Sequence, residues 1–360
     1  MTAARFGDEV FDGPLLEVTD IKTHFETDRG LVRSVDGVSF TLERGKTIGI
    51  VGESGSGKTV LSRSVMGLLP RRGLVREGSV RFEGKEMIGI PDKQMRAFWG
   101  SQMSMIFQDP MTSLNPVMKI GNQITESIRE HLDVTRDYAT DLAESLLTSV
   151  RIPEPKRRLE EYPHQLSGGM RQRVCIAVAL ACGPKLLFAD EPTTALDVTV
   201  QAQVLDLMAQ QQRERFMSIV LVTHDLGVVA GRADEIAVMY AGRIVEKAPT
   251  SVLFHDMKMP YTEALLSSIP KLGDPSHTRL ATIPGRPPDL VHPPAGCKFA
   301  PRCAYVQPKC LEEEPPLVDA KGAGHQFRCW FPVGTPEGKD ALERNRKAGA
   351  APAALAAKGA

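Results

Sequence analysis

Short apolar runs alternate with stretches of helical periodicity along residues 14–255. Runs such as TIGIV, which are largely free of polar residues, are typical of strands buried on both faces of a sheet. Apolar residues spaced three and four apart are typical of helices packed on that sheet. The predicted elements are strands at 47–51, 185–190 and 218–223 and helices at 60–69 and 170–182. This alternation predicts an α/β domain.

Composition separates three further regions from this domain. Residues 1–13 are predicted to be a short N-terminal tail. Residues 256–333 form a proline- and cysteine-rich region, since eleven of the 26 prolines lie between Pro284 and Pro336. That density predicts loops around a small rigid core, because proline cannot continue a helix or a central strand. Residues 334–360 are of low complexity, and we expect a partly helical or irregular tail.

Overall charge and hydropathy narrow the functional classes. Forty-four Lys and Arg balance 44 Asp and Glu, so the net charge is zero and nucleic acid is not an expected partner. The longest apolar run, Val174–Cys182, has nine residues, about half of what a membrane span requires. The N-terminus carries acids and no apolar core of a secretory signal. We therefore expect a soluble, cytosolic protein that can still dock on a membrane protein.

A phosphate-binding loop joins the first predicted strand to the first predicted helix. The order strand, GxxxxGK(S/T), helix directs backbone N–H groups and a helix N-terminus toward phosphate oxygens. Lys58 is expected to reach the β- and γ-phosphates, and the Thr59 hydroxyl to bind Mg²⁺. The pattern predicts ATP or GTP binding. Its candidate binding residues are Gly52, Ser54, Gly55, Ser56, Gly57, Lys58 and Thr59.

Two further groups carry candidate chemistry. Asp190 ends an apolar strand, where its carboxylate can support Mg²⁺, and Glu191 follows, where it can orient or deprotonate water. Ser167, Gly168 and Gly169 open the predicted helix 170–182 and make a second candidate anion site at its N-terminus.

In this order of elements the chain resembles the nucleotide-binding subunits of ABC transporters. Leu166–Met170 resembles that family's signature motif, with Met170 where glutamine is commoner. The other matching elements, in sequence order after the phosphate loop, are Gln108 of the Q-loop, Asp190 and Glu191 of Walker B, Ala195–Asp197 of the D-loop and the switch residue His224.

The resemblance implies a division of roles. Two subunits would close head to tail, so that Ser167 and Gly169 of the signature motif serve ATP bound on the partner. Gly168 and Asp197 of the D-loop are further candidate nucleotide-binding residues. Glu191, His224 and Gln108 would be catalytic, with His224 at the γ-phosphate and Gln108 linking Mg²⁺ and water to the membrane partner. The implied magnesium ligands are Thr59, Gln108 and Asp190.

An aromatic platform for the adenine ring is expected upstream of the phosphate loop, because stacking tolerates many sequences. Phe25 is the candidate. Phe40 lies in an alternating run and is predicted to pack in the core.

The spacing favours a transporter subunit. Only 57 residues separate Gln108 from Leu166, which suits a helical subdomain (about 92–175) that receives a permease; DNA-repair relatives carry long coiled-coil insertions there. Motifs at 107–116, 170–173, 190–203, 260–270 and 283–285 resemble the oligopeptide/dipeptide branch, although Met259 replaces its usual histidine. Residues 14–255 would be the nucleotide-binding domain.

The resemblance implies a D-type ATPase that pairs with a distinct F-type ATPase, two permease subunits and an extracytoplasmic binding protein. It would lie peripherally on the cytoplasmic face of the membrane and energise import of dipeptides or oligopeptides. Import of nickel, glutathione or opines uses the same type of ATPase. Two other classes stay open, a soluble ABC ATPase acting on nucleic acid or ribosomes, and a regulatory subunit with a weak ATP site.

The cysteines fall into two groups. Cys175 and Cys182 lie on the apolar helix and are predicted to be inert core residues. Four thiols in a loop-rich segment suit Zn²⁺, a 4Fe–4S cluster or simple burial, since disulfides fit poorly with a reducing cytosol. The resemblance to peptide transporters favours the 4Fe–4S cluster. Its implied ligands are Cys297, Cys303, Cys310 and Cys329.

Overall fold

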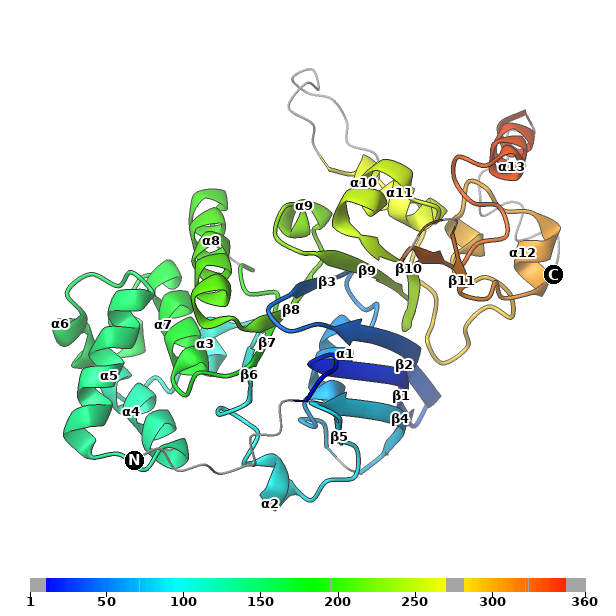
Figure 1. Ribbon diagram of the computed structural model, residues 1–360. Coiled ribbons are helices and arrows are strands. Elements are labelled where there is room, and N and C mark those ends of the chain that lie inside the picture. Colours follow the sequence, from blue (N-terminus) through cyan, green and yellow to red (C-terminus); the bar gives the residue numbers. More distant parts are fainter. Residues whose placement is uncertain are drawn as a thin grey trace.

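The computed structural model describes residues 11–70, 72–194, 196–269, 282–320, 322 and 324–347 (Figure 1). Most of the predicted N-terminal tail (1–10) and the last part of the low-complexity tail (348–360) lie outside these residues. The predicted α/β class is confirmed. Within the described residues no helix combines the length and the apolar character needed to cross a membrane.

An eight-stranded sheet forms the centre of the molecule. Its central strands pair in parallel, and β9 and β10 form an antiparallel hairpin at one side. In spatial order the strands are β11 (Val318–Asp319), β12 (Gln326–Phe327), β10 (Arg243–Pro249), β9 (Glu235–Tyr240), β3 (Thr47–Val51), β8 (Ser218–Thr223), β7 (Leu186–Asp190) and β6 (Met103–Ile106). The three strands predicted from apolar runs are therefore neighbours, with β8 between β3 and β7.

A smaller antiparallel sheet covers part of this centre. Its strands, in spatial order, are β2 (Gly30–Leu42), β1 (Leu16–Thr27), β4 (Leu74–Phe82) and β5 (Lys85–Glu86). The predicted core position of Phe40 is confirmed, since its side chain is 3% exposed.

Helices pack on opposite faces of the central sheet because alternate residues of each strand point to opposite sides. Val220 and Val222 of β8 share one apolar cluster with Leu61 of α1 (Lys58–Val65) and with the antiparallel sheet. Ile219 and Leu221 point the other way and pack with α7 (Gly168–Leu180) and α8 (Val198–Arg215). The phosphate loop and the signature motif therefore precede helices on different faces.

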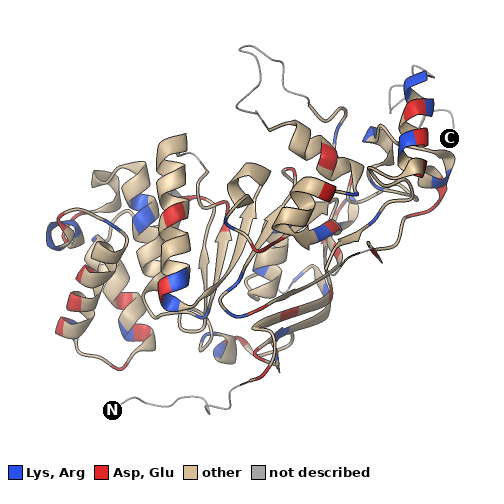
Figure 2. Ribbon diagram, turned by 45° about the horizontal axis from the view of Figure 1, so that its top comes forward, with Lys and Arg blue, Asp and Glu red and all other residues tan. Residues whose placement is uncertain are grey.

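Most of the remaining helices form two groups at opposite ends of the molecule (Figure 1). The group beside β6 comprises α3 (Pro110–Ser113), α4 (Ile120–His131), α5 (Arg136–Ser149), α6 (Pro155–Leu159) and the short 3₁₀ helix Pro163–Gln165. Helix α2 (Asp92–Met95) lies apart from this group, and its Met95 packs in the apolar cluster of the antiparallel sheet. The group beyond β9 and β10 comprises α9 (Leu226–Val229), α10 (Thr250–Asp256), α11 (Pro260–Ser267), the 3₁₀ helix Ala300–Arg302, α12 (Pro308–Glu312) and α13 (Pro336–Lys347). Helix α13 carries charges of both signs, with Glu337 in its first turn and Arg344, Arg346 and Lys347 in its last (Figure 2).

The small cysteine-rich domain predicted near the C-terminus is not confirmed, because the described parts of residues 256–347, called the C-terminal segment below, pack on the central sheet. Strand β12 pairs with β10 and so extends the central sheet. Phe299 and Tyr305 belong to the same apolar cluster as the face of the sheet that carries α7. The segment is stabilised by the core of the α/β domain, which a proline-rich sequence could not reveal.

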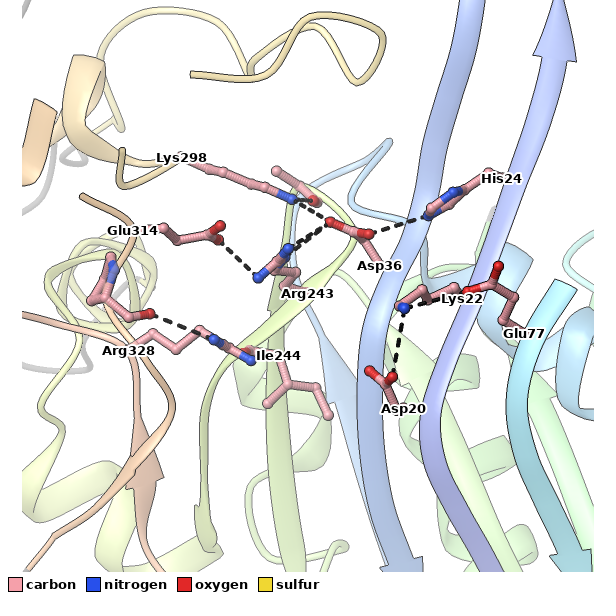
Figure 3. A network of polar contacts seen from close by, with 12 residues as sticks. Asp20, Lys22, His24, Asp36, Glu77, Arg243, Ile244, Lys298, Glu314 and Arg328 are labelled. Carbon is pink, nitrogen blue, oxygen red and sulfur yellow. Dashed lines mark hydrogen bonds and ion pairs between the residues drawn. The ribbon is translucent and has the colours of Figure 1, made fainter. Parts of the chain in front are cut away.

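A polar network joins the two sheets and the C-terminal segment at Asp36 of β2 (Figure 3). Arg243 of β10 donates to Asp36 Oδ2 through Nε at 3.0 Å and Nη2 at 2.8 Å. Lys298 Nζ lies 3.3 Å from the same oxygen, and His24 Nε2 lies 3.2 Å from Oδ1. Burial alone would raise the pKa of Asp36, but Arg243 and Lys298 outweigh it and lower the pKa to about 2.

Candidate functional site

The predicted phosphate loop lies between β3 and α1, and two of its glycines have no alternative. A Cβ atom at Gly52 would lie 2.1 Å from the carbonyl oxygen of Met239. A Cβ atom at Gly57 would lie 2.1 Å from the carbonyl oxygen of Ser34, and Gly57 has a φ of 101°. The loop therefore packs directly on the backbone of two neighbouring segments, at positions where only glycine fits.

Lys58 is the buried cation of this loop, with 4% of its surface exposed. Its Nζ donates to the carbonyl oxygens of Gly52 at 2.7 Å and Glu53 at 3.0 Å. Burial lowers the pKa of Lys58, and the nearby carboxylates of Glu191 and Asp190 partly oppose this change. Phosphate oxygens would be stronger acceptors than these carbonyls, because hydrogen bonds between charged groups are the strong ones.

The residues for a magnesium ion are also in place. Thr59 Oγ1 donates to Asp190 Oδ1 at 3.0 Å. Asp190 is fully buried, and its Oδ2 has no hydrogen-bond partner in the described part of the chain. Burial raises the pKa of Asp190, although the hydrogen bond from Thr59 opposes the rise. A buried carboxylate oxygen without a partner fits a dication bound between Thr59 and Asp190.

Glu191 is the centre of a second group of contacts at the end of β7. Its Oε2 lies 3.2 Å from Gln108 Nε2, 3.3 Å from His224 Nδ1 and 3.0 Å from Thr194 Oγ1. Its backbone is in the left-handed region, with φ 46°, where a non-glycine residue is strained. The structure therefore brings together all three catalytic candidates, Gln108, Glu191 and His224, at one carboxylate oxygen.

Thr194 is a contact that sequence reasoning missed. It lies three residues after Glu191 in the turn that follows β7, and only this turn directs its hydroxyl back to the carboxylate. The sequence Glu191-Pro-Thr-Thr194 indicates that a threonine lies near the carboxylate, but it does not show whether Thr193 or Thr194 makes the contact.

The predicted signature and D-loop residues lie at the N-termini of α7 and α8 and not at the phosphate loop. Ser167 caps α7, and its hydroxyl accepts from Met170 N–H at 3.3 Å. Asp197 caps α8, where its carboxylate accepts from Val200 N–H at 2.9 Å.

The signature motif and the start of α8 pack together. A Cβ atom at Gly169 would lie 2.7 Å from Cγ1 of Val200. Leu196 approaches Gly168, whereas Ala195 lies outside the described residues.

Phe25 lies on β1, opposite Val32 of β2 and Leu74 of β4. Its side chain is half-buried. Its role as the adenine platform stays a prediction.

The predicted metal centre in the C-terminal segment is wrong. The four cysteines do line one cavity, but its volume is about 10 Å³, the space of no more than one water molecule. Across the described residues no group of three or more cysteine, histidine or acidic side chains is arranged to hold a metal ion. The 4Fe–4S and zinc assignments are therefore both withdrawn.

Burial explains the state of these thiols. It raises the pKa of Cys303, Cys310 and Cys329, and that of Cys297 to about 11. Protonated thiols packed among apolar side chains are core residues, which is the alternative that spacing left open.

A phosphate loop, a buried aspartate and a glutamate–histidine pair at the end of a largely parallel sheet define an ATPase of the ATP-binding cassette type. A family model described as "ABC transporter" matches residues 35–194, and one described as "Oligopeptide/dipeptide transporter, C-terminal region" matches residues 245–310. The oligopeptide transport ATP-binding protein OppD of Bacillus subtilis is 49% identical over 88% of each chain. The chain belongs to the ABC transporter family, in the group of oligopeptide and dipeptide transport ATP-binding proteins.

Other relatives and solved structures agree. OppD of Haemophilus influenzae is 48% identical over 88% of this chain and 97% of its own, and DppD of B. subtilis, a dipeptide transport ATP-binding protein, is 47% identical over 88% and 94%. The dimeric ATP-binding cassette MJ0796, bound to ADP and phosphate, has a TM-score of 0.59 over 65% of this chain and 98% of its own. The structure of cbiO1 of Clostridium perfringens, part of an ABC transporter complex, has a TM-score of 0.57 over 68% of this chain and 91% of its own. At 23% and 24% identity these two likenesses concern the fold alone.

Proposed function

We propose that this chain hydrolyses ATP to drive the uptake of oligopeptides or dipeptides through a membrane complex. The observation that carries the proposal is the convergence of Lys58, Thr59, Asp190 and Glu191 at the end of the parallel strands. The relatives that are 47–49% identical over most of their length support the peptide cargo.

Each residue has a defined task in this reaction. Lys58 and the loop N–H groups bind and orient the phosphates, and Thr59 with Asp190 would hold Mg²⁺, which neutralises charge on the phosphate oxygens. Glu191 accepts a hydrogen bond from water or takes its proton, while Gln108, Thr194 and His224 hold its Oε2 in position. The strained backbone of Glu191 aims the carboxylate at the site.

The second half of each ATP site is assigned to a partner subunit. Ser167 caps α7, and Gly168 and Gly169 are its first two residues. Helix α7 lies on the face of the sheet opposite α1, so these residues lie apart from this chain's own phosphate loop. A head-to-tail dimer would place them, with Asp197, against ATP on the partner. We propose an F-type ATPase as that partner, together with two permease subunits and an extracytoplasmic binding protein.

We further propose a domain division and a location. Residues 14–255 are assigned to the nucleotide-binding domain, with a helical subdomain within about 92–175 that contacts the permeases, and residues 256–333 to the extension typical of peptide transporters. The chain would lie peripherally on the cytoplasmic face of the membrane.

The decisive experiment uses the complete complex in proteoliposomes with its binding protein. ATP hydrolysis should rise when a dipeptide or oligopeptide is added, and Lys58→Ala in this chain should abolish nucleotide binding at its phosphate loop. Stimulation by nickel, glutathione or an opine in place of peptides would overturn the cargo but retain the ATPase. Undiminished ATP affinity of the Lys58→Ala chain would overturn the site.

A further inference from the structure

The C-terminal segment reaches into the phosphate loop at one residue, Glu53. Arg302 forms a two-point ion pair with the Glu53 carboxylate, from Nη1 to Oε2 at 2.6 Å and from Nη2 to Oε1 at 2.9 Å. The Arg302 side chain is 3% exposed, and its Nε donates to the carbonyl oxygen of Pro284 at 2.8 Å. The guanidinium is therefore fixed from both sides, and it fixes the Glu53 side chain in turn.

The backbone of Glu53 is held by the same segment. Its N–H donates to the hydroxyl of Tyr261, on α11, at 2.9 Å. Tyr261 is fully buried, and its ring packs against Tyr240 and Phe299 with centroids 4.6 and 5.2 Å apart. The position of the hydroxyl is thus set by a rigid aromatic cluster to which the C-terminal segment contributes two of the three rings.

The third group of Glu53, its carbonyl oxygen, faces into the loop. It accepts from Lys58 Nζ at 3.0 Å and from Ser56 N–H at 3.2 Å. Ser56 in turn accepts from Gly242 N–H at 3.0 Å, next to Ala241, whose carbonyl oxygen accepts from Lys298 of the C-terminal segment at 3.2 Å. Every polar group of Glu53 therefore lies between the C-terminal segment and the residues that receive phosphate.

We propose that Arg302 and Tyr261 are positioning residues for ATP, which hold the phosphate loop through Glu53 in the shape that binds nucleotide. Neither residue contacts the nucleotide in this assignment. A loop held in its binding shape does not lose conformational entropy on binding, so its affinity for nucleotide is higher. The inference rests on the proposed function, because it assumes that ATP binds at this loop.

The test measures MgATP binding to the full chain and the kcat and KM of the assembled transporter. Tyr261→Phe removes one hydroxyl and keeps the aromatic packing. Arg302→Lys keeps the charge and removes the two-point geometry. We expect each change to raise the Kd and KM for ATP by about threefold to tenfold, with kcat within about twofold of the wild type.

Two variants of the same segment serve as matched controls. Tyr305→Phe removes a buried hydroxyl that donates to Glu263, and Arg328→Lys alters a buried arginine that donates to the Ile244 carbonyl oxygen. Neither contacts the phosphate loop through these bonds, so both should bind MgATP like the wild type. An unchanged Kd in Tyr261→Phe would overturn the proposal, as would equal losses in the controls, which would indicate a general loss of structure. Tyr261→Phe decides the matter if Arg302→Lys fails to fold.

This test is separate from the test of the function itself. A wild-type chain that binds no MgATP would overturn the proposed function. If the wild-type chain binds MgATP and the Tyr261→Phe and Arg302→Lys chains bind it with the same affinity, only the positioning role is overturned.

Discussion

The Thr59 hydroxyl lies 3.0 Å from Oδ1 of Asp190, although 131 positions separate the two residues in the sequence. This hydrogen bond joins the phosphate loop to the end of strand β7. The other carboxylate oxygen of Asp190, Oδ2, has no hydrogen-bond partner in the described residues. We expect Asp190→Asn to raise the Mg²⁺ concentration for half-maximal ATP hydrolysis by about 10–100-fold, as when a metal site loses a supporting group.

The measurement is a Mg²⁺ titration of ATP hydrolysis at saturating ATP. Thr59→Ser keeps the hydroxyl and is the control that should stay near the wild type. An unchanged Mg²⁺ requirement in Asp190→Asn would contradict the assignment of this carboxylate.

Glu191→Gln should preserve ATP binding and reduce turnover by about 10²–10⁴-fold, the usual contribution of a positioned base. The amide cannot take a proton, but it still fills the space between Gln108, Thr194 and His224. Turnover should be measured in the assembled transporter with the partner's site inactivated.

The matched control is Glu161→Gln. The Glu161 side chain is 13% exposed, like that of Glu191, and it pairs with Arg158 among the helices beside β6. Equal turnover of Glu191→Gln and Glu161→Gln would exclude Glu191 as the base.

The Asp36 network predicts a pH-dependent stability. The pKa of Asp36 falls from 3.8 to about 2 on folding. A lowered carboxylate pKa stabilises the folded state above the unfolded value, and this contribution is lost as the pH falls from about 4 toward about 2. We expect Asp36→Asn to lower the free energy of unfolding at pH 7 by about 2–4 kcal/mol, because Arg243 and Lys298 lose their buried partner.

Urea unfolding at pH 7 and pH 3 checks this prediction, since the difference between wild type and Asp36→Asn should shrink at the lower pH. Asp289→Asn removes an exposed ion pair with Arg29 and should cost less than about 1 kcal/mol. A difference for Asp36→Asn that is equal at both pH values would show that the charge of Asp36 does not matter.

The partial or full burial of the six cysteines predicts slow alkylation. The thiolate is the reactive form, and burial raises the pKa of every cysteine, to about 11 for Cys297 and about 12 for Cys175. At pH 8 we expect iodoacetamide to label Cys297 in the folded chain about a hundredfold more slowly than in the urea-unfolded chain. Peptide mapping by mass spectrometry after timed quenching measures the rate. Equal labelling of the folded and unfolded chains would contradict the burial of this thiol.

Most of the nucleotide site was predictable from sequence because its chemistry is local. Gly52 to Thr59 encode a turn that only glycine can make, flanked by a strand and a helix whose periodicity is visible. Strands 47–51 and 218–223 were predicted with their observed bounds, since short apolar runs such as Ile219–Val222 are typical of strands buried on both faces of a sheet. The first helix was predicted to run to 69 but ends at Val65, because Gly67 adopts a φ of 68° before Pro70 is reached.

The tertiary structure decided what depends on residues far apart in the chain. Arg302 meets Glu53 across 249 positions, and no periodicity or motif encodes that distance. The sequence by itself determined that four cysteines lie within 33 positions of one another, but packing decided that no group of three or more metal-binding side chains is arranged around an ion in the described residues. A motif can be found in the sequence because its shape depends on residues that are adjacent in the chain. A contact between distant segments depends on how whole helices and strands pack, and only the tertiary structure determines that packing.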